Sequence, residues 1–223
     1  MKKTFFNRWL ICGFIFIGML IAVRIKYSGS IRFIFLVRNL FLAWIPYIIS
    51  LQIRKPVYTG KINILFLFFW LLFFPNALYI ATDLIHLHET GDVPIWFDAV
   101  LLFLSSFIGF ALALASLWNV EVFLKRFMQR GSLTITILTL LFAGSFGVYL
   151  GRFERWNSWN IIDRPIELFT DVLNRFIHPV NYIETWITVS IFTGMNCLLW
   201  FFVKAFIFTG PVTSPVMQKK VPQ

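Results

Sequence analysis

Six apolar runs, each long enough to cross a bilayer, constrain the fold of this chain more than any other feature of its sequence. A membrane-spanning helix needs about 20 predominantly apolar residues. Only 13% of the residues are charged and 59% are hydrophobic, whereas a soluble domain carries about 25% charged residues. The sequence therefore predicts an all-α, polytopic membrane protein with about six transmembrane helices. The expected spans are residues 9–23, 31–53, 62–84, 95–118, 133–150 and 183–208.

The segments outside the spans predict one interfacial helix and one tail. Within residues 163–178 the apolar side chains share one helical face and the charged ones avoid it, which is typical of a helix lying in the membrane interface. Residues 210–223 contain three prolines and two lysines, and we expect a disordered basic tail there. Residues 1–209 are then a single integral-membrane domain. Residues 9–23 follow a basic start as in a signal peptide, but no small-x-small cleavage site follows, so we interpret them as an uncleaved span.

The net charge of +10 predicts an association with lipid headgroups. The basic residues are scattered between apolar runs instead of forming one stripe, which argues against nucleic acid as a partner and for membrane lipids. With six spans both termini lie on one side, and that side carries twelve Lys and Arg residues against seven on the other. The positive-inside rule then places both termini in the cytoplasm.

The end of the third span carries the most unusual polar residues of the chain. Asn76, Tyr79, Asp83 and His86 fall within an arc of about 80° if the segment is an α-helix. Such groups are expensive in hydrocarbon and usually turn towards partners. The carboxylate of Asp83 also lies near a helix C-terminus, where the helix dipole disfavours it, so we expect a cation beside it. The candidate cations at the same predicted depth are Arg38, Arg152 and Arg155.

Nearly all of the unusual polar residues map to the outer side of the membrane in this orientation. Asn39 lies in the outer half of the second span, Asp98 at the outer start of the fourth, and Asn157 beyond the outer end of the fifth. We therefore predict an outward-facing polar site that binds an anionic or lipid-headgroup-like ligand. Its predicted ligand-binding residues are Arg38, Asn39, Asn76, Tyr79, Asp83, Asp98, Arg152, Arg155 and Asn157.

Two alternatives stay open for the same residues. One is a membrane-embedded hydrolase or transferase acting on lipid or envelope material, with Asp83, His86 or Asp98 as catalytic residues. The other is a structural or assembly protein in which the charges only lock helices together. A divalent metal cofactor would use Asp83, His86 and His88, which supply oxygen and nitrogen donors, although their spacing matches no established metal motif.

Small residues recur at every fourth position near the end of the fifth span, at Ala143, Gly147 and Gly151. This small-x3-small pattern lets two membrane helices approach each other closely. It predicts a close helix contact on this face, either within the chain or in a homo-oligomer.

Three segments together resemble the signature of a known membrane-protein family. They are Pro75-Asn76-x-x-Tyr79-x-x-Thr82-Asp83-Leu84, Trp96-x-Asp98 and Gly151-Arg152-Phe153-x-Arg155-Trp156-Asn157-Ser158-Trp159. The family is the bacterial integral-membrane domain of unknown function 1361, and the resemblance extends from about Arg38 through the sixth span. It implies a bacterial multi-pass membrane protein, which we expect in the cytoplasmic membrane, and it implies no activity or substrate.

Overall fold

A computed structural model describes residues 3–54, 60–87 and 93–208, and every regular element within these ranges is helical. Six helical segments of this part of the chain are long and apolar enough to cross a membrane, which confirms the predicted all-α, polytopic membrane class. The predicted tail, residues 210–223, lies outside the described residues. The long helices are α1 (Lys3–Ser28), α2 (Phe35–Ile53), α3 (Gly60–Tyr79), α4 (Ile95–Leu124), α5 (Arg130–Arg152) and α8 (Ile183–Phe208).

Shorter helices extend or connect the long ones. They are η1 (Arg32–Ile34), η2 (Ile80–His86), α6 (Asn160–Asp163) and α7 (Pro165–Ile177). The amphipathic helix expected over residues 163–178 forms α7, which begins with a proline, a residue favoured in the first turn because its missing N–H has no partner there. The apolar side chains of Ile166, Phe169 and Phe176 remain exposed on its surface, as suits a helix lying at a lipid boundary.

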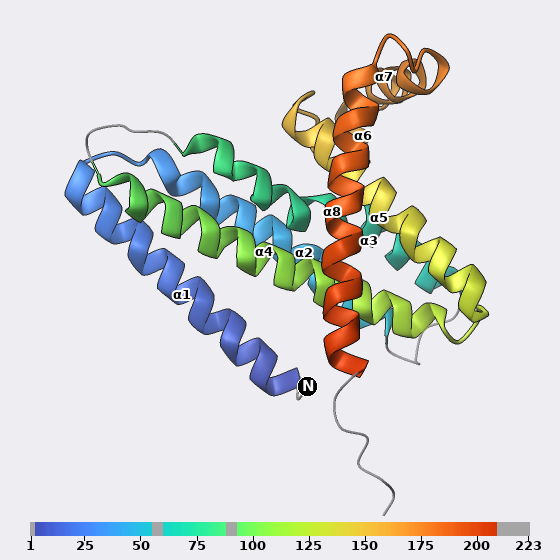
Figure 1. The fold of residues 1–223 in the computed structure, drawn as a ribbon, viewed down its shortest axis with the longest axis horizontal. Coiled ribbons are helices and arrows are strands. Elements are labelled where there is room, and N and C mark those ends of the chain that lie inside the picture. Colours follow the sequence, from blue (N-terminus) through green and yellow to red (C-terminus); the bar gives the residue numbers. More distant parts are fainter. Residues whose placement is uncertain (1–2, 55–59, 88–92, 209–223) are drawn as a thin grey trace, which may run out of the picture.

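The centre of the molecule is formed by α2, α3 and α4, which all pack against one another. Around this centre, α1 packs on α4, α5 packs on α3, and α8 packs on α5 (Figure 1). Figure 1 also shows α7 beyond one end of α8. Large apolar side chains along α1 and α8 are exposed, because these peripheral helices turn much of their surface towards the surrounding lipid.

Close helix contacts on both sides of α3 depend on glycine. A Cβ atom on Gly147 of α5 would lie 2.4 Å from Cγ of Pro75, and one on Gly109 of α4 would lie 2.8 Å from the carbonyl oxygen of Ala77. The predicted small-residue stripe of α5 therefore places Gly147, together with Gly151, against α3 of the same chain. A homo-oligomer through this stripe stays a prediction.

The third span differs from the sequence prediction, which extended one helix to Leu84. The α-helix ends at Tyr79, and a 3-10 helix covers Ile80–His86. A 3-10 helix has three residues per turn, so Ile80, Asp83 and His86 follow one line along it. Ile80 and Asp83 are both buried, which means that the tighter winding turns the carboxylate into the bundle.

Candidate functional site

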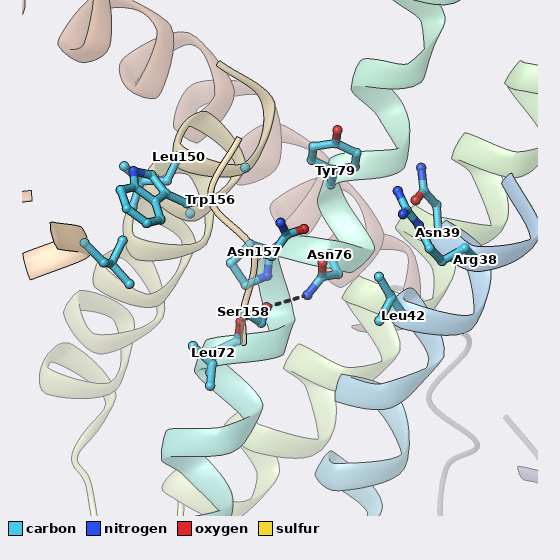
Figure 2. A pocket seen from close by; sticks show the side chains of 14 residues that line it. Arg38, Asn39, Leu42, Leu72, Asn76, Tyr79, Leu150, Trp156, Asn157 and Ser158 are labelled. Carbon is cyan, nitrogen blue, oxygen red and sulfur yellow. Dashed lines mark hydrogen bonds between the residues drawn. The ribbon is translucent and has the colours of Figure 1, made fainter. Parts of the chain in front are cut away.

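A cavity of about 140 Å³ lies at one end of the bundle, between α2, α3, α5 and the chain that follows α5. Figure 2 shows Arg38 and Asn39 of α2 on one side, and Asn76 of α3 beside Asn157 on the other. Five of the nine predicted ligand-binding residues line this cavity, so the structure brings them together. The polar residues of its lining are Arg38, Asn39, Asn76, Tyr79, Asn157 and Ser158.

Hydrogen bonds of Asn76 and Ser158 connect the chain after α5 to α3. The Asn76 amide donates hydrogen bonds to the Ser158 hydroxyl at 3.0 Å and to the Phe73 carbonyl at 3.1 Å. The Ser158 hydroxyl donates in turn to the carbonyl of Leu72 at 3.0 Å. These hydrogen bonds hold residues 156–158 against α3 within one turn of Pro75, and they fix one wall of the cavity.

A buried charge network supports the cavity lining from inside the bundle. Asp83 is 1% exposed and accepts hydrogen bonds from Nδ2 of Asn39 at 2.8 Å and from Nη2 of Arg152 at 2.5 Å. Arg152 also donates from Nε to the Thr82 hydroxyl at 2.7 Å, and its guanidinium lies over the Tyr79 ring, 4.4 Å from the centroid. Because the network holds Asn39 and Tyr79 directly, it fixes two cavity residues in place.

The three candidate cations for Asp83 have three different positions. Arg152 is the one that pairs with Asp83. Arg38 lines the cavity with an exposed side chain and has no hydrogen bond or ion pair among the described residues. Arg155 is exposed, adopts a positive φ of 61° and does not line the cavity.

Asp98 also lies apart from the cavity lining and is paired elsewhere. Arg24 donates from Nε and Nη2 to its two carboxylate oxygens at 2.7 and 2.9 Å, and the Phe33 ring covers the guanidinium at 4.3 Å. The sequence does not indicate this partner, because the predicted first span ends at Val23, one residue before Arg24. Since α1 continues to Ser28, Arg24 is helical and buried. The sequence feature that could have indicated this is the position of Arg24 directly after an apolar run.

The candidate metal ligands are only partly described. Nε2 of His86 lies 3.4 Å from Nη1 of Arg152, and its ring packs edge-on against Phe35. Asp83 and His86 thus both lie beside the Arg152 guanidinium. The third candidate, His88, lies outside the described residues. Within the ranges that the structure describes, no group of three His, Cys, Asp or Glu side chains could hold a metal ion.

A second set of charges connects the cavity to α7. The Trp156 indole donates to the Asp171 carboxylate at 2.8 Å, and Asp171 and Glu154 both pair with the buried Arg175. Burial by itself lowers the pKa of Arg175, but the hydrogen bonds to Asp171 and Glu154 outweigh it and raise that pKa above its ordinary value. Leu168 of α7 lines the cavity, so the interfacial helix and the cavity wall form one connected structure.

Comparison with known proteins gives one match. The family model described as "Protein of unknown function (DUF1361)" matches residues 38–199, a range that contains every residue lining the cavity. No curated protein and no solved structure matches the chain.

Proposed function

We propose a ligand-binding function for this chain, which belongs to the DUF1361 family of proteins of unknown function. It is an integral membrane protein with six apolar helices that could span a bilayer, counted over the described residues. Its polar cavity binds an anionic or lipid-headgroup-like ligand. The observation that carries this proposal is that the Arg38 guanidinium, which lines the cavity, has no carboxylate partner among the described residues.

Arg38 differs from the buried arginines of the same protein. Arg24, Arg152 and Arg175 are each paired with a carboxylate, whereas Arg38 has no such partner among the described residues. The cavity therefore has one positive charge that no neighbouring carboxylate offsets. A guanidinium presents a planar set of N–H donors that matches phosphate and carboxylate oxygens, which supports an anionic ligand at this position.

The size and the neutral lining of the cavity support a small ligand group. Pockets that enclose drug-sized ligands have volumes of roughly 300–1,000 Å³, while this cavity has about 140 Å³. A phosphate or a headgroup fits that size better than a whole organic ligand. The amides of Asn76 and Asn157 and the phenol of Tyr79 add directional hydrogen bonding next to the charge.

We place the cavity in the outer leaflet of a bacterial cytoplasmic membrane, with both termini in the cytoplasm. The opposite end of the bundle gathers basic residues around the buried Glu121: Lys125 and Lys204 pair with it, and Arg126 donates to the carbonyl of Arg54 nearby in the fold. A basic end is the one expected on the cytoplasmic side, which supports this orientation.

One specific observation favours a second candidate function, that of a structural protein. The buried pairs Asp83–Arg152 and Asp98–Arg24 join η2 to α5 and α4 to α1, as expected for charges that lock helices together. That function leaves Arg38 without a role. The enzyme alternative would require a substrate to reach the Asp83 carboxylate, whose side chain is only 1% exposed.

Thermal unfolding of the detergent-purified protein tests the proposed binding. The probes are glycerol phosphate and dioctanoyl phosphatidylglycerol, two anions that share a glycerol–phosphate group. A ligand at about 100 times its Kd adds about 2.7 kcal/mol to the free energy of unfolding, so at least one probe should raise the Tm of the unmodified protein. Arg38→Gln should abolish the increase, because the substitution removes the uncompensated charge.

Arg155→Gln is the matched control, since it removes an exposed arginine from the same end of the protein without changing the cavity lining. It should keep the full increase in Tm. An equal increase in Arg38→Gln, or no increase with either anion in the unmodified protein, would contradict the proposal.

A further inference from the structure

The third helix carries the cavity on the face turned away from the centre of the bundle. Trp70 and Phe74 of α3 are at most 1% exposed and lie on its packed face, where Phe74 meets α5. At 100° per residue, Leu72, Asn76 and Tyr79 lie on the opposite side of the same helix. These three residues line the cavity, so it lies on the side of α3 opposite Trp70 and Phe74, between α2 and α5.

That same face continues below the cavity as an apolar strip. Leu65, Phe68 and Phe69 lie on it and are 54%, 51% and 41% exposed. Leu65 is almost two full turns from Leu72, so apolar side chains follow one another without interruption up to the cavity. From Leu65 to Asn76 the helix rises about 16 Å, which is roughly half of the ~30 Å hydrocarbon core. The strip therefore has the length of one lipid leaflet.

The neighbouring helices border this strip without covering it. Both α2 and α5 pack on α3, and Leu42 and Leu150 bring an apolar side chain from each to the cavity. Figure 2 shows Leu42 and Leu72 below the polar residues Arg38, Asn39 and Asn76. Leu42 and Leu72 thus form an apolar edge of the cavity, and Leu72 continues along α3 into the exposed apolar strip.

We infer that the ligand is a membrane lipid with an anionic headgroup, which enters the cavity sideways from the bilayer. Its phosphate lies at Arg38 beside the amides and the phenol, and its acyl chain lies along Leu72, Phe68 and Leu65. A soluble anion would use the polar part alone and leave the apolar strip without a role. This inference rests on the proposed function and names the chemical class of its ligand.

Native mass spectrometry of the full-length protein with added lipid tests this inference. Dioleoyl phosphatidylglycerol should remain bound about tenfold more tightly than dioleoylglycerol, which lacks the phosphate, because the charge-assisted hydrogen bond from Arg38 contributes enough for such a factor. Glycerol phosphate should not displace the bound lipid, since it lacks the chain.

Two substitutions of the apolar strip test the position of the chain. Leu72→Trp fills the passage beside the cavity, and Leu65→Trp fills the exposed far end of the strip. Leu65→Trp should weaken binding of dioleoyl phosphatidylglycerol several-fold and leave the short-chain dihexanoyl lipid unaffected, while Leu72→Trp should weaken both. Leu198→Trp, at a leucine of α8 that is 75% exposed, is the matched control and should change neither.

The outcomes separate this inference from the proposed function. Binding of glycerol phosphate that Arg38→Gln abolishes and both strip substitutions leave unchanged would overturn sideways lipid entry and keep the proposed function. Lipid retention that Arg38→Gln leaves unchanged would overturn both. Equal weakening by Leu198→Trp would show that the retained lipid merely coats the surface, which also overturns the inference.

Discussion

At the scale of single residues, Asp83 is the point where three elements meet. It belongs to η2, accepts a hydrogen bond from Asn39 of α2, and pairs with Arg152 of α5. The Asp83 and Arg152 side chains are 1% and 12% exposed, so neither charge has much access to water. Removing one member of such a pair leaves the other charge uncompensated, so the loss of one partner should cost more stability than the loss of both.

Asp83→Asn should lower the free energy of unfolding by about 3 kcal/mol, because it leaves Arg152 as an unpaired buried charge. Adding Arg152→Gln should recover part of that loss. Unfolding in mixed micelles, analysed as a double-mutant cycle, measures the coupling between the two residues. Asp163→Asn is the control, since its side chain is exposed, and it should change stability by less than about 0.5 kcal/mol. Purely additive effects at Asp83 and Arg152 would contradict the assigned pairing.

At the scale of elements, α5 can pack closely against α3 because glycines on one face of α5 carry no side chains. Gly147 meets the Pro75 ring and Gly144 meets the Phe74 ring, closer than a Cβ atom could normally approach. Gly147 also lines the cavity. The same contact therefore holds two helices together and sets the width of the cavity between them.

Gly147→Ala should lower stability by about 1–3 kcal/mol, the usual effect of overpacking a closely packed contact, and it should also weaken anion binding because α5 has to move away from Pro75. The control is Gly18→Ala in α1, where nothing lies within 4 Å of the added Cβ and alanine is the better helix former. Thermal unfolding compares the stability of the two variants with that of the unmodified protein. A Gly147→Ala protein as stable as the Gly18→Ala protein would argue against the close α3–α5 contact.

At the scale of the whole molecule, we expect the cavity to face the outside of the cell. In a background with Cys12→Ala and Cys197→Ala, a cysteine placed by Arg155→Cys at the cavity end should react with a membrane-impermeant maleimide on intact cells. Arg126→Cys, an exposed position at the opposite end, should react only after permeabilisation. The reverse pattern would place the cavity on the cytoplasmic side and remove the outer-leaflet assignment.

Features governed by local hydrophobic pattern could be predicted from the sequence. Span length and helical periodicity are properties of consecutive residues, so the six spans and the amphipathic helix α7 were accessible. The sequence predicted a common depth for Arg38, Asn39, Asn76, Tyr79 and Asn157, but that they line one cavity is seen only in the structure. The family resemblance was confirmed by the match over residues 38–199.

Features governed by which helices are neighbours could not be predicted. Hydropathy does not record that α1 packs on α4, so the pairing of Arg24 with Asp98 was missed. For the same reason Arg152 could not be distinguished from Arg38 and Arg155 as the partner of Asp83. The change from α-helix to 3-10 helix after Tyr79 depends on burial of Ile80 and Asp83 in the assembled bundle, which no local propensity shows.

The most direct test of binding at Arg38 is an experimental structure of the protein in nanodiscs that contain phosphatidylglycerol. We expect a phosphate-sized density within hydrogen-bonding distance of the Arg38 guanidinium, continuing as a chain over Leu72 on the lipid-facing side of α3. A cavity that holds only water, with Arg38 paired to a carboxylate of the protein, would contradict this expectation.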